Sequence, residues 1–139
     1  MESSYELFDH TADIGIRVRG NRLADLVVPA GEGLYAVIGD IVTGERREEM
    51  SIDLTGDTPE TLLRDYLAEL LILFEQDHRI VSDVRVSRFD RDGLAVRAAT
   101  EGVDLARSTL EREVKAITYH ALEIREVAGG FEGTVIVDI

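Results

Sequence analysis

The sequence predicts an α+β fold, a two-layer sandwich in which a mixed β-sheet carries two to three helices on one face. Three observations predict it: several short segments alternate apolar and polar residues as strands do, one long stretch repeats leucine at helical spacing, and hairpin signals join most of the strands. A length of 139 residues suits one domain with its own core and is too short for two. We therefore expect a single domain over residues 1–139.

The first segment predicts two short strands on either side of a polar bend. Tyr5 and Leu7 lie at alternate positions before the tetrad HTAD, and Ile14, Ile16 and Val18 lie at alternate positions after it. Successive side chains of a strand point to opposite faces, so each run presents one apolar face. The tetrad interrupts the pattern and is expected to form an irregular bend.

Residues 21–38 carry apolar side chains at helical spacing, with Asn21 as the expected N-cap. Three residues inside this stretch oppose a regular helix. Pro29 lacks a backbone N–H, and Gly31 and Gly33 each cost a helix about 1 kcal/mol relative to alanine. The sequence therefore predicts a kinked or split helix.

The strongest helix signal begins at Thr58, an expected N-cap, followed by Pro59 at the first helical position. A broad apolar face follows, with most of the charged side chains outside it. We interpret this face as packing, with no chemistry of its own. Its members are Leu62, Leu63, Tyr66, Leu67, Leu70, Leu71, Leu73 and Phe74.

Most of the remaining chain predicts strands. The sequence DRDG at residues 90–93 is typical of a hairpin turn between two of them, and Gly129-Gly130 turns the chain into the last strand. The predicted strands lie at residues 48–54, 80–89, 94–100, 122–127 and 131–137.

One further helix is expected late in the chain. Leu110, Val114 and Ile117 recur at helical spacing within residues 108–118. A parallel pairing of the first strand with the last would bring the motifs at the two ends of the chain together.

The charge balance is strongly acidic, with 28 Asp and Glu against 15 Lys and Arg and a net charge of −13. Such a chain repels phosphate backbones, so tight unaided binding of RNA or DNA is not expected unless the arginines cluster on one face. The acidity is typical either of a solvated surface, as in salt-adapted proteins, or of attraction to metal ions or a basic partner.

Composition also bounds the compartment and the chemistry. No apolar run approaches the roughly 18 residues of a membrane span, and the first residues lack the basic and apolar regions of a secretory signal. We expect a cytoplasmic protein with no membrane partner. Because the sequence contains no cysteine, it has no disulfides, thiolate zinc sites or cysteine nucleophiles.

Three carboxylates are expected to meet if the two ends of the chain lie together. The sequence closes on the apolar run VIVDI, which should hold the Asp138 side chain and the α-carboxylate of Ile139 in fixed places. With Asp13 nearby, these groups would repel one another unless a cation or protons neutralised them. Carboxylates without thiolates favour Ca²⁺, Mg²⁺ or Mn²⁺.

Three other polar residues leave alternatives open. His10 and Asp13 at i, i+3 are also a common turn arrangement, and His120 on an apolar segment is also typical of a core histidine. Lys115 is the one lysine in a chain that otherwise uses arginine, which suggests a need for a compact ammonium. Catalytic interpretations are weak, because the sequence has no nucleophile elbow, Gly-rich phosphate loop or HExxH motif.

Four ordered blocks resemble the archease family: DHTADIGI, LAELLILFEQ, EVKAITYHALEI and GGFEGTVIVDI. The resemblance runs across nearly the whole chain. It implies a non-enzymatic protein that activates the RtcB-type RNA ligase of tRNA splicing, promotes guanylylation of the ligase's histidine by GTP, restores multiple turnover and can broaden nucleotide use. RNA would then be reached only indirectly, through the ligase.

The resemblance also implies a metal site, described in the family with calcium. Its ligands correspond here to Asp13, Asp138 and Ile139, the last through backbone carboxylate or carbonyl oxygens. Other residues of the same blocks are candidates for contacting the partner or supporting the site. They are His10, Lys115 and His120.

Two departures from the family pattern are visible. Ser108 follows Arg107 where many members carry a histidine, which puts any role of that side chain in doubt. Pro29, Gly31 and Gly33 also interrupt a first helix that is usually alanine-rich. Neither departure touches the three expected ligands.

Two other functions stay open at this point. A stand-alone metal-dependent hydrolase would use Asp13 with His10 or His120 as base. A general chaperone or binding module would use the carboxylates only for its fold. Turnover by the isolated protein would favour the first, and suppression of light scattering from an unfolding client the second.

Overall fold

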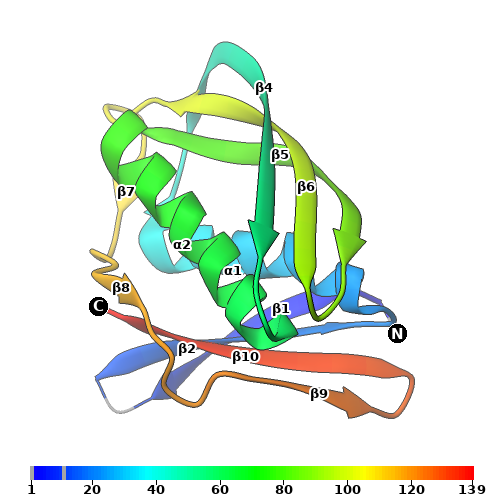
Figure 1. Ribbon diagram of the computed structural model, residues 1–139. Helices are drawn as coiled ribbons and strands as arrows, with labels where there is room; N and C mark the ends of the chain where they lie inside the picture. The colour runs from blue at the N-terminus through cyan, green and yellow to red at the C-terminus, as the bar shows by residue number, and fades with distance from the viewer. Residues whose placement is uncertain (1, 11) are drawn as a thin grey trace.

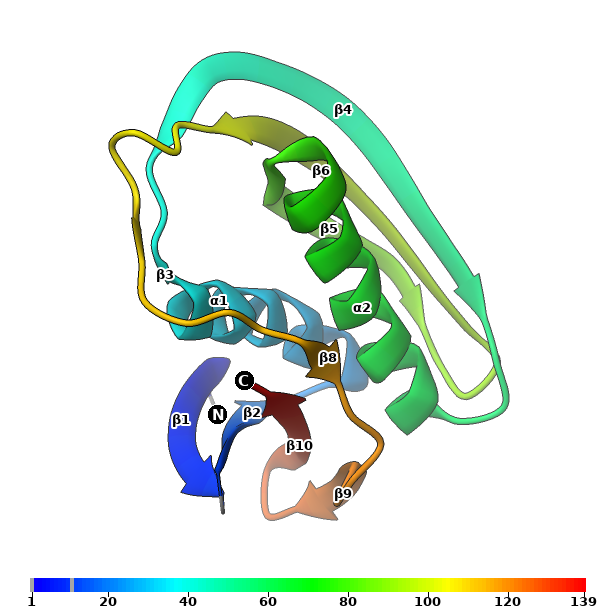
Figure 2. The same ribbon diagram turned by 90° about the vertical axis from the view of Figure 1, so that its left-hand side faces the viewer.

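The computed structural model describes residues 2–10 and 12–139 of the protein. Within these residues, two α-helices lie between two antiparallel sheets, as the two views show (Figure 1, Figure 2). The α+β class predicted from the sequence is confirmed. The layering differs from the prediction, because the helices separate two sheets and do not cover one face of a single sheet.

The first sheet contains strands from both ends of the chain. Its order is β1-β2-β10-β8, and β9 pairs with the other end of β10. All of these pairings are antiparallel, so the predicted mixed sheet is wrong, and so is the parallel pairing of the first strand with the last. The strands are β1 Ser4–His10, β2 Asp13–Gly20, β8 Ala116–Ile117, β9 Glu123–Val127 and β10 Gly130–Asp138.

The antiparallel order still joins the two ends of the chain. β1 and β2 form a hairpin, and β10 pairs along the other side of β2. Because β10 runs opposite to β2, the end of β10 lies beside the beginning of β2. The bend predicted for HTAD is the turn of this hairpin, where Ala12 has a φ of 69° and Thr11 lies outside the described residues.

The second sheet has the order β4-β6-β5. Its β5–β6 hairpin turns at DRDG as predicted, because the Asp90 carboxylate accepts hydrogen bonds from the N–H groups of Asp92 and Gly93 at 2.8 and 3.0 Å. The strands extend beyond the predicted ranges. They are β4 Thr43–Thr55, β5 Arg79–Phe89 and β6 Gly93–Val103.

The first helical stretch is split, as predicted. Pro29 falls in the first turn of α1, where an N–H group would have no partner within the helix. The N-cap is Arg22 and not the predicted Asn21, and the Asp25 carboxylate accepts the Arg22 N–H at 3.0 Å. The two pieces are the 3-10 helix η1 Leu23–Leu26 and α1 Val27–Ile38.

The predicted N-cap of the second helix is confirmed. α2 spans Pro59–Asp77, and Thr58 Oγ1 accepts the N–H of Thr61 at 3.2 Å. α1 packs on β1 and β2, whereas α2 packs mainly on the second sheet and also reaches β8 and β9. Within the described chain, neither helix is long and apolar enough to cross a membrane. Core side chains with 0% exposure include Ile16, Leu34, Leu63, Leu67, Leu70 and Val137.

Residues 108–118 do not form the predicted helix. They are extended and contribute two short strands, β7 Thr109–Leu110 and β8 Ala116–Ile117. β7 pairs with β3, Gly39–Asp40, and β8 joins the edge of β10. Val114 and Ile117 are buried all the same.

The extended form of this segment has a physical reason. The N–H groups of Glu111 and Arg112 donate to the carbonyl of Ile38 at 2.8 and 3.3 Å, and Arg112 Nη1 donates to the carbonyl of Val37 at 3.1 Å. These carbonyls belong to the last turn of α1, where the helix offers them no donor. The segment therefore satisfies the end of α1 and does not build a helix of its own.

Candidate functional site

A row of directly opposed residues crosses one end of the first sheet. His10 pairs with Asp13, Asp13 with Asp138, and Asp138 with Ala116. Directly opposed residues of antiparallel strands point to the same face, with Cβ atoms about 4.5–5.5 Å apart. The structure thus brings Asp13 and Asp138 side by side, so their predicted proximity is confirmed. Their role as metal ligands stays a prediction.

Hydrogen bonds hold the last residues of β10 in place. The N–H of Lys115 donates to the Asp138 carbonyl at 2.8 Å, and the N–H and Oγ1 of Thr118 donate to the Ile136 carbonyl at 3.0 and 2.9 Å. Ile139 is half-buried and packs against the core. The main chain at the end of β10 is therefore held by the segment that contains Lys115 and Thr118.

Two histidines meet at the same end of the sheet. The rings of His10 and His120 have their centroids 5.2 Å apart and their planes inclined by 58°. His120 is exposed and is therefore not a core histidine, whereas His10 is half-buried. Among the described residues, the buried His10 Nδ1 has no hydrogen-bond partner. A polar ring atom thus lies unpaired in the residue that directly opposes Asp13.

The segment that carries His120 is tied to α2. Arg64 Nε donates to the Ile117 carbonyl at 2.9 Å, and its guanidinium lies over the ring of Tyr119, 4.4 Å from the centroid. Tyr119 nevertheless remains 62% exposed, and Lys115 is exposed as well. Sequence reasoning missed Arg64, because nothing in a single sequence distinguishes it from other charged residues on a packing helix.

The donor set at this end suits a hard divalent cation. It offers the carboxylates of Asp13 and Asp138, with Ile139 next to Asp138 in the chain, and oxygen donors are what Ca²⁺ prefers. No group of three or more His, Cys, Asp or Glu side chains in the described chain is arranged to hold a metal ion. A cation here would therefore need the Ile139 oxygens, water or a partner group to complete the two carboxylates.

The other end of the same face is charge-compensated. The Glu132 carboxylate accepts hydrogen bonds from Arg125 Nη2 at 2.9 Å and Arg19 Nε at 2.7 Å. These bonds, with Arg125 contributing most, hold the pKa of Glu132 below its usual range. In the part of the chain that the structure describes, no ion pair joins Asp13 or Asp138 to a cation. The uncompensated negative charge of this face therefore lies at the row.

Ser108, which departs from the family pattern, has a structural role. Its Oγ accepts the N–H of Val42 at 2.8 Å and lies 2.7 Å from the Asp104 carbonyl, to which it donates. These bonds fasten the loop before β7 to the link between β3 and β4. Ser108 does not belong to the row at the sheet end.

Comparison with known proteins identifies similar chains. A model of the Archease protein family (MTH1598/TM1083) matches residues 5–139. The chain is 36% identical to a protein archease of Methanosarcina barkeri, over 97% of this chain and 95% of the relative. It is 34% identical to a protein archease of Pyrococcus furiosus, over 91% of each chain.

Two solved structures are similar in fold. The solution structure of protein 1598 of Methanobacterium thermoautotrophicum has a TM-score of 0.75 at 27% identity and covers 100% of both chains. A Thermotoga maritima crystal structure, titled an archease and possible chaperone, has a TM-score of 0.72 at 22% identity and covers 96% of both. At that lower identity the second likeness shows the fold alone.

Proposed function

Because the match over residues 5–139 and relatives at 36% identity show that the chain belongs to the archease family, we propose that it is a non-enzymatic activator of an RtcB-type RNA ligase in tRNA splicing. It promotes GTP-dependent guanylylation of the ligase's histidine, supports multiple turnover and broadens nucleotide use. The observation that carries the proposal is the pairing of Asp13 with Asp138 at the end of a sheet where two histidines also meet.

In this proposal Asp13, Asp138 and the main-chain oxygens of Ile139 hold one divalent cation. Calcium suits the donors best, and manganese or magnesium are alternatives. When bound, the cation supplies positive charge that phosphate oxygens of a nucleotide can approach. The protein's own contribution is rigidity: β2 and β10 set the two carboxylates, and the Lys115 N–H fixes the main chain of Asp138 at 2.8 Å.

The ligase contacts the exposed side chains around the row. Tyr119, Lys115 and His120 are exposed there, and Arg64 holds the segment that carries them. The net charge of −13 favours a basic ligase surface, with an association rate that falls as salt is added. RNA is reached only through the ligase, and the two proteins meet in the cytoplasm.

A guanylylation assay with the purified partner ligase tests the proposal. Asp13→Asn and Asp138→Asn should each reduce activation, on the order of tenfold or more for a lost metal ligand. Asp9→Asn is the matched control, because it removes the same charge from an exposed residue outside the row. Asp9 is paired with the core residue Ile14, so both lie on the other face of the sheet from Asp13 and Asp138. Activation by Asp13→Asn equal to that of the wild type would remove the metal site from the function.

The terminus needs a separate measurement. Protein with a free Ile139 should bind calcium more tightly than protein extended beyond that residue, because the extension removes the α-carboxylate. Calorimetric titration of calcium into both forms measures this difference. Equal affinities would show that the terminal oxygens are not ligands.

Two other functions, a chaperone and a hydrolase, can be tested with the same purified protein. The Thermotoga maritima relative is titled a possible chaperone, so suppression of light scattering from an unfolding client is measured alongside activation. Broad suppression without ligase activation would favour a chaperone. Turnover of phosphate esters by the isolated protein, lost in Asp13→Asn, would favour a hydrolase.

A further inference from the structure

A groove lies between α2, the end of α1 and the extended segment 104–115. Its volume is about 410 Å³, which is enough to take one large side chain of another protein. Such buried anchor side chains contribute most of the binding energy in many protein–protein interfaces. Most of the residues that line the groove are apolar. They are Ile38, Leu71, Phe74, Leu105, Leu110 and Val114.

The apolar surface of the groove is open to a partner. Leu71 and Val114 are buried, whereas Leu105 and Leu110 are 45% and 48% exposed. Both exposed leucines line the same groove. Exposed apolar surface that is contiguous and rimmed by polar residues is typical of interaction sites.

The wall that carries Leu110 is held by hydrogen bonds. Leu110 pairs with Gly39 in the short β3–β7 ladder. On its other side the N–H of Glu111 donates to the Ile38 carbonyl at 2.8 Å, and Arg112 Nη1 donates to the Val37 carbonyl at 3.1 Å. A surface that is already ordered loses little conformational entropy when a partner binds.

Two exposed carboxylates stand at the rim of the groove. Glu75 on α2 and Glu113 line it, and no ion pair involves either of them within the described residues. Arg112 also lines the groove, but its guanidinium is 3.6 Å from the Glu111 carboxylate, which compensates its charge. A lysine or arginine of a partner would be attracted to this rim, and an acidic residue would be repelled.

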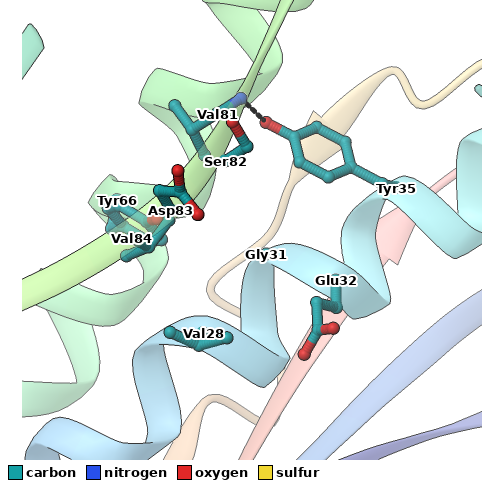
Figure 3. A pocket seen from close by; sticks show the side chains of 9 residues that line it. All are labelled: Val28, Gly31, Glu32, Tyr35, Tyr66, Val81, Ser82, Asp83 and Val84. Carbon is teal, nitrogen blue, oxygen red and sulfur yellow. Dashed lines mark hydrogen bonds between the residues drawn. The ribbon is translucent and has the colours of Figure 1, made fainter. Parts of the chain in front are cut away.

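The groove adjoins the row that contains Asp13 and Asp138. Val114 lines the groove, and Ala116, a member of the row, follows two residues later. In Figure 2 this segment runs from the end of β6 past the end of α1 to β8, beside the C-terminus. The cavity drawn in Figure 3, by contrast, is lined from α1, α2 and β5 and has no lining residue in the sheet that carries the row.

We propose that this groove is a second docking point for the RtcB-type ligase, which inserts one apolar side chain that stands next to a lysine or arginine on the ligase surface. The inference rests on the proposed function and adds a contact to it. The apolar side chain covers Leu105 and Leu110, and the neighbouring cation lies beside Glu75 and Glu113. Because the groove lies outside the row, it sets the affinity for the ligase and not the maximal rate of guanylylation.

Titration of the protein into the guanylylation assay separates affinity from maximal rate. The double variant Leu105→Ala, Leu110→Ala should raise the half-saturating concentration about tenfold and leave the maximal rate unchanged, because only the docking surface is lost. Ile72→Ala is the matched control. Ile72 is 45% exposed on α2 and does not line the groove, so its removal should leave both quantities unchanged.

The charge of the rim is tested in the same assay. Glu75→Gln and Glu113→Gln should each raise the half-saturating concentration about twofold to fivefold at low salt, as expected for an exposed charge pair. The difference from the wild type should shrink as salt is added. Glu69→Gln, which removes an exposed charge from α2 outside the groove, should have a far smaller effect.

Photocrosslinking locates the contact directly. Because the sequence contains no cysteine, Leu110→Cys and Ile72→Cys each provide a single thiol for a benzophenone maleimide. The label at position 110 should crosslink to the ligase, at a peptide in which an aromatic or branched apolar residue stands next to lysine or arginine. The label at position 72 should not crosslink.

Weaker half-saturation in the groove variants, with crosslinking from position 110 alone, supports the proposal. An unchanged half-saturating concentration in the double variant, or equal crosslinking from both positions, would overturn it while wild-type activation leaves the proposed function standing. Failure of the wild type to bind and activate the ligase would overturn both.

Discussion

Removing the hydroxyl of Tyr66 is expected to make the protein more stable. The residue is 0% exposed, and its Oη has no hydrogen-bond partner among the described residues. A buried polar group left unpaired costs about 1–3 kcal/mol of stability. Because Tyr66→Phe deletes the oxygen and keeps the ring, it should raise the free energy of unfolding by about 1 kcal/mol. For a chain of this length that corresponds to a rise in Tm of about 3 °C.

Tyr35→Phe provides a control with the same chemistry and the opposite sign. The Tyr35 Oη accepts the N–H of Val81 at 2.9 Å, and Val81 is 7% exposed. Deleting that oxygen leaves a backbone donor without a partner, so the free energy of unfolding should fall by about 1–3 kcal/mol. Two substitutions that remove one oxygen each, from neighbouring rings, should therefore move stability in opposite directions.

Urea denaturation followed by circular dichroism measures both variants against the wild type. Unchanged slopes of free energy against urea would show that only stability has changed. If Tyr66→Phe proved equally stable or less stable, the hydroxyl would have a partner in solution, and the reasoning from an unpaired donor would be refuted.

Three further predictions follow from other parts of the structure. Burial raises the pKa of Tyr35 to about 12. Its neutral form therefore stabilises the fold fully below pH 10, and this stabilisation is lost as the pH rises toward 12. Urea denaturation between pH 9 and 11.5 should show a fall in the free energy of unfolding that is smaller in Tyr35→Phe than in the wild type. Calcium at about 100 times its dissociation constant should stabilise the wild type by about 2.7 kcal/mol, an effect kept in Asp9→Asn and lost in Asp13→Asn; equal thermal shifts in both variants would contradict the metal site. Gly15→Ala would place a Cβ 2.1 Å from Phe8 Cζ, which should cost about 1–3 kcal/mol by overpacking; a cost that persists in a Phe8→Ala background would rule out that clash.

Local signals predicted those parts of the fold whose hydrogen bonds are local. Thr58 caps α2 through Thr61, three residues along the chain, and Asp90 closes its turn through Asp92 and Gly93. In these cases the residue and its partner lie within a few positions, so the pattern contains the whole interaction. The proximity of Asp13 and Asp138 was predicted on two other grounds. One was a pairing of the first strand with the last, whose parallel direction is wrong, and the other was the resemblance to a known family, which implied both residues in one site.

The failures arose where a distant partner decides the local structure. Residues 108–118 carry helical spacing, yet Glu111 and Arg112 are held by the Ile38 carbonyl at the end of α1. Nothing in the sequence of the segment predicts that the Ile38 carbonyl will be its acceptor. Tyr66 packs in the core as predicted, but only the placed neighbours show that its buried hydroxyl has no hydrogen-bond partner in the described chain.

The pairing of β2 with β10 also determines the stage of folding at which Asp13 and Asp138 come together. Asp13 and Asp138 come from opposite ends of the chain, and closing so long a loop is entropically unfavourable until the surrounding contacts form. A cation held by both carboxylates would bind the native state and have little affinity for the unfolded chain. Its release would then accompany separation of the two strands, so calcium occupancy would report on the kinetics of a contact between residues from opposite ends of the sequence.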